Sequence, residues 1–113
     1  MHFPDHFPSR YWAECTSAHF AAARAAGVMD QSIAVLPVGA TEQHGPHLPL
    51  QVDSAIANAL VQSAIGTLTP ATPALFLPTL PVGYSPEHSG FGGTLTLKAE
   101  TVLRLAGFGV VRT

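Results

Sequence analysis

The sequence predicts a layered α/β fold with a mainly parallel β-sheet. Segments with helical patterning alternate along the chain with short apolar segments that have the composition of strands. The first strand segment, residues 33–38, shows no alternation of polar and apolar residues, which is typical of a parallel strand covered on both faces. A chain of 113 residues can form one domain around one core. We therefore expect parallel strands joined by right-handed helical crossovers.

The first helix is predicted in the Ala-rich segment that ends at Ala26. Thr16 or Ser17 can cap its first turn, since a hydroxyl oxygen accepts a hydrogen bond from a free backbone N–H group. Gly27 follows at the position where a left-handed residue closes a helix. Residues 33–38, which are apolar and rich in β-branched side chains, then form the first strand.

A second helix is predicted over residues 54–64, after a loop at residues 40–52. Asp53 can cap this helix, and Gly66 is expected to stop it. The apolar stripe of the helix comprises Ile56, Leu60 and Ala64.

The second strand is predicted at residues 75–80, which form another apolar run. Pro78 and Pro81 cannot donate backbone hydrogen bonds to a neighbouring strand. We therefore expect this strand to lie at an edge of the sheet or to end early.

A third helix and a third strand complete the pattern. A loop over residues 81–94 leads to Thr96, which can cap a helix that ends near Ala106 and is closed by Gly107. Residues 109–112 begin a strand, within which the sequence stops. Parallel sheets normally have more than three strands and are covered on both faces, so we expect a fold that is truncated after this strand.

Composition and charge exclude several classes of partner. The net charge is −2 and the five Lys and Arg residues are scattered singly, so no basic patch can hold a nucleic acid or an anionic membrane. The apolar runs are far shorter than the ~20 residues that a membrane-spanning helix needs. Cys15 is the only cysteine, which rules out an internal disulfide and suits a reducing compartment.

The beginning of the chain shows no targeting pattern. Residues 1–10 lack an apolar run long enough for a signal peptide. We therefore expect a cytoplasmic protein with a flexible tail at residues 1–10 and a single domain at residues 11–113.

The loop at residues 40–52 carries the side chains that are suited to chemistry. It directly follows the first predicted strand, and ligands of α/β proteins bind beyond the carboxyl ends of strands. Glu42 and His44 are two residues apart, so in extended backbone both side chains point to the same side. Asp53 stands at the start of a helix, where free N–H groups keep a carboxylate ionised and its two oxygens can bridge two cations.

A carboxylate, an imidazole and a second carboxylate form a ligand set that suits zinc or manganese. Two such ions can activate a water molecule as nucleophile and polarise an amide carbonyl, so that no protein nucleophile is required. The spacing also leaves an alternative open. Glu42 could be a solvated loop charge, His44 a hydrogen-bonded turn residue, and Asp53 a helix cap without a metal ion.

The segment at residues 36–53 resembles the signature of the creatininase (creatinine amidohydrolase) family. Residues 42–50 read Glu-Gln-His-Gly-Pro-His-Leu-Pro-Leu and are followed by Asp53, a combination that hardly arises by chance. The resemblance continues through residues 83–97 and covers most of the chain from Tyr11 onward. It identifies the chain as the N-terminal portion of a family member.

The resemblance implies a metal site and a fold. In the family pattern Glu42 binds one metal ion, His44 binds the other, and Asp53 bridges them, which gives two divalent ions, zinc or manganese or both. The implied fold is a three-layer α/β sandwich that often assembles as a homo-oligomer. The implied activity is hydrolysis of C–N bonds in cyclic or formyl amides and small peptides. His88 matches a family histidine near the mouth of the active site and is expected to bind substrate; its alternative is a loop histidine bonded to backbone.

Two departures from the family pattern affect the site. The family usually has Phe-Pro-Gly-Thr where this chain has Phe91-Gly-Gly-Thr94, so the loop loses a proline and gains conformational freedom. The family continues into an Asn-Gly-His-Gly turn that completes the metal ligands, and the catalytic residues are expected beyond Thr113. The sequence therefore predicts a metal-dependent amide hydrolase acting on small amides. The alternative is a truncated, non-catalytic member that binds metal weakly or serves as an assembly fragment.

Overall fold

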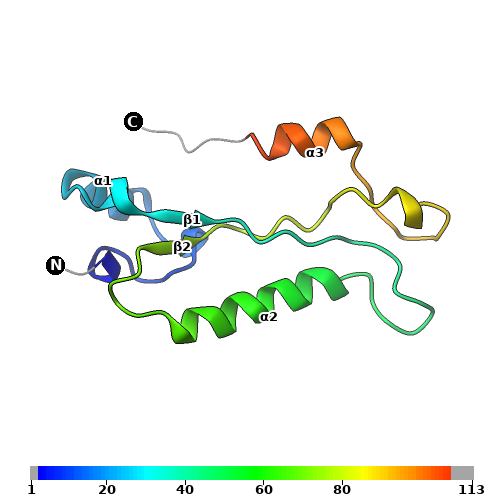
Figure 1. Ribbon diagram of the computed structural model, residues 1–113, viewed down its shortest axis with the longest axis horizontal. Coiled ribbons are helices and arrows are strands. Elements are labelled where there is room, and N and C mark those ends of the chain that lie inside the picture. The colour runs from blue at the N-terminus through cyan, green and yellow to red at the C-terminus, as the bar shows by residue number, and fades with distance from the viewer. Residues whose placement is uncertain (1–2, 108–113) are drawn as a thin grey trace. The chain divides into compact units, whose positions relative to one another are not determined.

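The computed structural model describes residues 3–107 (Figure 1). In chain order the helices and strands are α1 (Ser17–Ala25), β1 (Ile33–Val35), α2 (Val52–Thr67), β2 (Ala74–Phe76) and α3 (Ala99–Leu105). Short 3-10 turns occur at Phe3–His6, Trp12–Glu14, Val28–Gln31 and Pro86–His88. Helices and a parallel pair of strands confirm the α/β class. The strand predicted at residues 109–112 lies outside the described residues.

The chain divides into two compact units. The first contains the described residues up to Pro37 together with Ala57–Thr79. The second contains Val38–Ile56 and the described residues from Leu80 onward. The predicted metal ligands and His88 all belong to the second unit.

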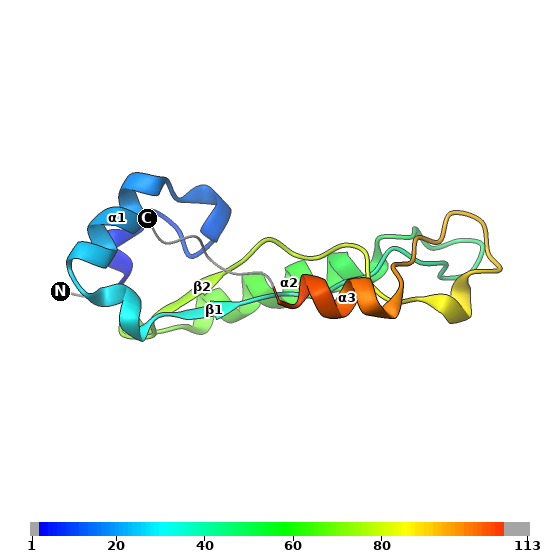
Figure 2. The same ribbon diagram turned by 90° about the horizontal axis from the view of Figure 1, so that it is seen from above.

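The strand pair belongs to the first unit. β1 and β2 run parallel, with Ile33 opposite Ala74 and Val35 opposite Phe76 (Figure 2). The other side of β2 pairs with the N-terminal segment, where the Phe76 N–H donates to the Arg10 carbonyl at 2.8 Å. The sequence left open an edge strand or one that ends early; among the described residues β2 has one strand partner, β1, and its other side forms only an isolated bridge between Tyr11 and Phe76. The pairing with Arg10 is non-local, and no local sequence pattern signals it.

The two strands differ from their predicted lengths and burial. β2 ends at Phe76, before Pro78, as expected of a strand that stops early. All three of its residues are buried. β1 was predicted to be covered on both faces, but Ile33 is 54% exposed, because no described helix packs extensively against this strand.

The core of the first unit joins the N-terminal segment to α1 and β2. Phe7, Ala23 and Leu75 are buried together. The Phe20 ring lies 5.2 Å from the Phe7 ring and 4.4 Å from the Trp12 ring, measured between centroids, so aromatic packing holds α1 in place. The division into a tail at residues 1–10 and a domain from residue 11 stays a prediction, although Phe7 is part of this core.

Arg10 holds the turn that precedes β2. Its guanidinium donates to the carbonyl of Thr72 at 2.6 Å, to that of Ala74 at 3.0 Å and to that of Thr69 at 3.0 Å. A planar fork of N–H donors can satisfy several carbonyls at once, which a lysine cannot do with the same geometry.

The first predicted helix is confirmed together with both of its caps. The Thr16 hydroxyl accepts from the His19 N–H at 3.3 Å, and His19 Nδ1 accepts from the Thr16 N–H at 2.9 Å. This is a reciprocal capping box in which histidine takes the place of Glu or Gln. Gly27 follows α1 with φ of 77°, in the left-handed region that favours glycine.

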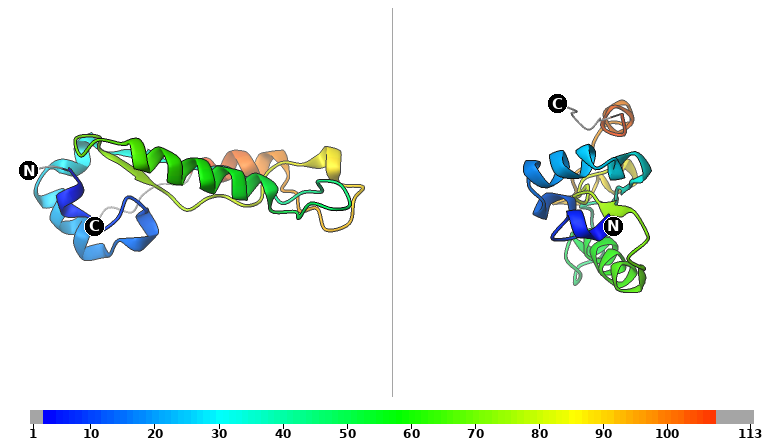
Figure 3. Two further views of the ribbon diagram at one scale, coloured as in Figure 1. Left: turned by 90° about the horizontal axis from the view of Figure 1, so that it is seen from below. Right: turned by 90° about the vertical axis from the view of Figure 1, so that its left-hand side faces the viewer.

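α2 is longer than predicted and is drawn as one continuous helix in Figure 3. It begins at Val52, so Asp53 lies inside the first turn instead of capping it, and the Gln51 carbonyl accepts from the Ala55 N–H at 2.8 Å. Gly66 does not stop the helix, because an internal glycine costs only about 1 kcal/mol relative to alanine. The predicted stripe finds no cover among the described residues: Ile56 is 55% and Leu60 is 65% exposed.

α3 begins later than predicted. Its N-cap is Lys98, because the Thr96 hydroxyl accepts a hydrogen bond from the Ser85 N–H at 2.8 Å instead of capping the helix. Its last turn closes through Ala106, and the Gly107 N–H donates to the Arg104 carbonyl. In the described part of the chain, no helix combines the length and hydropathy needed to cross a lipid bilayer.

Candidate metal centre

Two irregular segments of the second unit run side by side and carry the candidate site. The Leu95 N–H donates to the Thr41 carbonyl at 2.8 Å in an isolated antiparallel bridge. Two residues further, the Gln43 N–H donates to the Thr94 hydroxyl at 3.1 Å. These bonds tie the loop after Val38 to the loop that contains His88. They explain how residues about fifty positions apart in sequence share one site.

Gly39 brings the beginning of α2 against the first of these segments. A Cβ atom at Gly39 would lie 2.3 Å from Ser54 Oγ and 2.9 Å from the Ser54 Cα. Real side chains do not tolerate a contact of that length with backbone, so only glycine fits. This close approach places Asp53, the neighbour of Ser54, next to the loop that carries Glu42 and His44.

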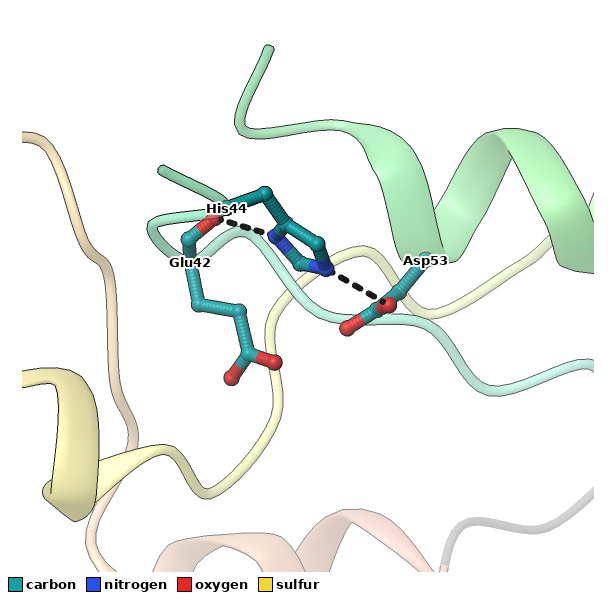
Figure 4. A group of neighbouring side chains, drawn as sticks. All are labelled: Glu42, His44 and Asp53. Atoms are coloured by element: carbon teal, nitrogen blue, oxygen red, sulfur yellow. Dashed lines mark hydrogen bonds and ion pairs between the residues drawn. The ribbon is translucent and has the colours of Figure 1, made fainter. Parts of the chain in front are cut away.

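Glu42, His44 and Asp53 point toward one another (Figure 4). Each offers one ligand atom, and the three atoms lie within 4.8 Å of one another. His44 Nε2 lies 3.2 Å from Asp53 Oδ1. The Glu42 side chain is 15% exposed, that of His44 22% and that of Asp53 36%, so the group opens to solvent on the side of the aspartate.

The backbone fixes the orientation of the His44 ring. Nδ1 lies 2.9 Å from the Glu42 carbonyl oxygen, which can only accept, so Nδ1 carries a proton. Nε2 is then the ring atom that faces Asp53, and a histidine whose Nδ1–H is bonded to a carbonyl can offer Nε2 to a metal ion. The hydrogen bond to the Glu42 carbonyl raises the pKa of His44 above its ordinary value; partial desolvation opposes this, and the charge of Asp53 adds to it.

The described residues fit a divalent cation. Two carboxylates and one imidazole form a mixed oxygen and nitrogen donor set of the kind that zinc and manganese accept. The negative charge of Glu42 and Asp53 favours a cation between them.

A second group of donors shares Glu42 with the first. Ligand atoms of Glu42, Glu87 and His88 also lie within 4.8 Å of one another. His88 Nε2 is 3.8 Å from the Glu42 carboxylate and 3.8 Å from the Glu87 carboxylate. The structure therefore brings His88 to the same site as the three predicted ligands. The sequence left open a loop histidine bonded to backbone; within residues 3–107 the hydrogen-bond partner of the His88 ring is the Gln43 side-chain amide, 2.9 Å from Nδ1.

Two members of this site were missed by sequence reasoning. Gln43 lies between the two predicted ligands of the loop, and strict alternation in extended backbone would turn its side chain away from theirs. Glu87 precedes His88 in a 3-10 turn, Pro86–His88, and its side chain is 65% exposed. The position of Gln43 inside the Glu-Gln-His string was the one signal that could have singled it out.

Gly92 and Gly93, which follow Phe91, differ in whether their surroundings leave room for a side chain. Gly93 has φ of 86°, and a Cβ there would lie 2.8 Å from Leu50 Cδ1, so this position requires glycine. A Cβ at Gly92 would meet nothing within 4 Å, and this is the position where the family pattern has proline. Position 92 therefore has room for a side chain, and glycine is not required there by packing.

Comparison with known proteins shows the family of this chain. The sequence model of the family described as creatinine amidohydrolase (creatininase) matches residues 13–107. Two curated relatives are named mycofactocin precursor peptide peptidase. The one from Mycobacterium ulcerans (strain Agy99) is 42% identical over 73 residues, which are 60% of this chain and 29% of the relative. The one from Mycolicibacterium smegmatis (strain ATCC 700084 / mc(2)155) is 45% identical over 65 residues, 56% of this chain and 26% of the relative.

Solved structures of creatininases have a similar fold. A crystal structure of creatinine amidohydrolase (creatininase) matches with a TM-score of 0.62 and 35% identity, over 83% of this chain and 36% of that chain. A structure titled as the manganese form of creatininase matches with a TM-score of 0.62 and 35% identity, over 82% of this chain and 35% of that chain. The chain thus spans about a third or less of the length of these relatives.

Proposed function

We propose, since this chain belongs to the creatininase (creatinine amidohydrolase) family, that Glu42, His44 and Asp53 hold divalent metal ions in a hydrolase of C–N bonds. Members of this family are hydrolases. The single observation that carries the proposal is the convergence of the three ligand atoms within 4.8 Å. Such a convergence of two carboxylates and an imidazole is costly without a cation, because the carboxylates repel each other.

Each of the three residues has a separate task in this proposal. Glu42 would help to hold one ion and His44 the other through Nε2, and the two oxygens of the Asp53 carboxylate would let it contribute to both. The hydrogen bond from Nδ1 to the Glu42 carbonyl keeps the His44 lone pair aimed at the ion. Zinc and manganese are the proposed ions, and the titles of similar creatininase structures name a Zn–Zn form and a manganese form.

The bound ions would activate water and polarise an amide carbonyl. His88 is the residue of this chain that we place next to the substrate, because it lies beside Glu42 and its side chain is 26% exposed. The names of the mycobacterial relatives specify a precursor peptide, so the proposed substrate class extends from small cyclic amides to peptide bonds.

We further propose that the protein forms a homo-oligomer in the cytoplasm. Exposed apolar side chains such as Leu60 and Leu103, 65% and 74% exposed, support a contact with another copy, and the free thiol of Cys15 suits a reducing compartment. Light scattering should give a mass that is a multiple of the chain mass. A monomer at micromolar concentration would contradict the assembly.

Metal content tests the proposal most simply. After loading with Mn²⁺ and gel filtration, the wild type should retain two ions per chain. Asp53→Ala should lose nearly all of this metal, and His44→Ala should keep more of it, because one carboxylate serves both ions. The matched control is Asp30→Ala, an exposed aspartate of the first unit, which should retain the wild-type amount.

Three results would count against this assignment. Equal metal loss in Asp53→Ala and His44→Ala would contradict the bridging role, and full retention in both would exclude the site. Creatinine and a set of short peptides should then be incubated with the loaded wild type. Cleavage of either class supports the hydrolase, whereas tight metal binding without any cleavage would support the non-catalytic alternative.

A further inference from the structure

The side-chain amide of Gln43 has only one possible orientation. The Gly45 N–H points at Gln43 Oε1 from 2.9 Å. A backbone N–H is a donor and never an acceptor, so the amide oxygen must be the atom that faces Gly45. The amide nitrogen therefore faces the other neighbour, His88, whose Nδ1 lies 2.9 Å away.

This orientation determines which nitrogen of the neutral His88 ring carries the proton. The amide nitrogen of Gln43 carries two hydrogens and has no lone pair to offer, so His88 Nδ1 must accept. A neutral imidazole has one protonated nitrogen. The proton of His88 is therefore on Nε2.

A separate observation on the opposite side of the ring leads to the same tautomer. Nε2 lies 3.8 Å from a carboxylate oxygen of Glu42 and 3.8 Å from one of Glu87. A lone pair directed at two carboxylates would be repelled, whereas an N–H dipole is attracted by both. These distances are longer than a direct hydrogen bond, so the contact is electrostatic.

We propose that Gln43 is a positioning residue that locks His88 as the Nε2–H tautomer, and so holds a hydrogen-bond donor beside Glu42. The inference rests on the proposed function in one respect, because it takes Glu42 to be a metal ligand. In this state His88 has no free lone pair. The group of Glu42, Glu87 and His88 is then not a second cation site, even though its donor atoms are close together.

The locked tautomer also specifies what His88 offers to a substrate. An Nε2–H group donates a hydrogen bond, so it recognises an acceptor such as the carbonyl oxygen of an amide. The same group cannot recognise a donor such as an amide N–H. Gln43 would thus select which part of a small amide or peptide lies beside Glu42.

Nitrogen-15 NMR of the metal-free protein at pH 8.5 tests the tautomer directly. Long-range proton–nitrogen spectra distinguish a protonated ring nitrogen from an unprotonated one, and the signals of His88 are those that disappear in His88→Asn. His44 Nδ1 is an internal reference for a protonated ring nitrogen, because its contact with the Glu42 carbonyl requires a proton there. We expect Nε2–H for His88 in the wild type. Nδ1–H, or an equal mixture, would overturn the inference.

The Gln43→Glu variant tests the cause. Its carboxylate retains an acceptor for Gly45 but replaces the donor that faces His88 with a second acceptor, at nearly unchanged shape. His88 should then carry a proton on Nδ1. The exposed helical residue Gln62 provides the control, and Gln62→Glu should leave the His88 signals as in the wild type. An unchanged Nε2–H pattern in Gln43→Glu would refute the role of Gln43.

The result is independent of metal binding, so the two proposals can fail separately. If Gln43→Glu does not fold, the NMR spectrum of the wild type still decides whether His88 is the Nε2–H tautomer. The Gln43→Met variant removes both hydrogen bonds of the side-chain amide. Its Mn²⁺ affinity should be about tenfold weaker than that of Gln62→Met, as is usual when a residue that orients a metal ligand is lost. Equal affinity would contradict the link to Glu42. A wild type that shows the expected tautomer but binds no Mn²⁺ would overturn the proposed function only.

Discussion

His44 is fixed by its own backbone before any metal arrives. The ring bonds to the carbonyl of Glu42, two residues earlier in the chain, so the direction of Nε2 depends on a local turn and not on distant packing. A pre-oriented imidazole loses little freedom when it binds an ion. This local geometry agrees with the expectation that the side chains of Glu42 and His44, two residues apart, point to the same side.

The same contact makes metal binding depend on pH. The pKa of His44 is raised above 6.5, chiefly by the carbonyl of Glu42. Protons therefore compete with the metal for Nε2 at a pH above the ordinary histidine range. We expect the Mn²⁺ affinity to be constant at high pH and to fall about tenfold per pH unit once the pH drops below the raised pKa. Calorimetric titrations between pH 8.5 and pH 5.5 measure this. Constant affinity throughout would contradict the role of His44 as a ligand.

In the metal-free protein the raised pKa of His44 favours the folded state at low pH, whereas low pH weakens metal binding. The folded state binds the His44 proton more tightly than the unfolded chain does, so the contribution is fully present below the unfolded pKa and is lost as pH rises through the folded pKa. Urea unfolding of wild type and His44→Gln should therefore differ more at pH 5.5 than at pH 8.5. A difference that grows with pH would contradict this assignment.

The elements show where local sequence determines structure and where it does not. α1 was predicted with both caps because Thr16 and Gly27 act on neighbours in sequence. The start of α3 was missed because Thr96 bonds to Ser85, a partner eleven residues away. The flank of β2 was missed because Arg10 reaches it from the N-terminal segment. Non-local contacts therefore account for the start of α3 and for the pairing on this side of β2.

The site residues also divide into those set by local sequence and those set by contacts with distant segments. Glu42, His44 and Asp53 could be named from the loop and the helix start, whereas the partners of Gln43 could not. Its contacts with His88 and Thr94 depend on the pairing of two loops far apart in sequence. Periodicity describes the direction of a side chain along one strand and carries no information on which loop lies beside it.

Substitution of glycine by alanine should have opposite effects on the free energy of unfolding at Gly39 and at Gly66. Gly39→Ala forces a Cβ to 2.9 Å from the Ser54 Cα and should lower the free energy of unfolding by about 1–3 kcal/mol, the usual cost of overpacking. It should also displace Asp53 and weaken Mn²⁺ binding. Gly66→Ala meets nothing within 4 Å inside α2 and should raise stability by about 0.5–1 kcal/mol.

Urea unfolding of the two alanine variants, with the metal-free wild type beside them, measures both effects. Gly66→Ala should bind Mn²⁺ as the wild type does, since it lies outside the second unit. The account of α2 is wrong if Gly39→Ala is as stable as the wild type and binds metal equally well.

At the scale of the whole molecule, every residue assigned to the site belongs to the second unit. This unit ties its two loops and the first turn of α2 together by its own hydrogen bonds and by the approach of Gly39 to Ser54. The chain covers about a third of the similar creatininase structures, and it is this portion that carries the three converging donors. The central claim therefore concerns these donors and can be tested on this chain as it is.

A crystal structure of the zinc-loaded chain, with anomalous difference density collected at the zinc edge, tests that claim most directly. We expect two zinc peaks at this site, one about 2.0–2.2 Å from His44 Nε2 and an oxygen of Asp53, and the other at the same distance from oxygens of Glu42 and Asp53. Zinc density elsewhere on the protein, with these three side chains free of metal, would contradict the account.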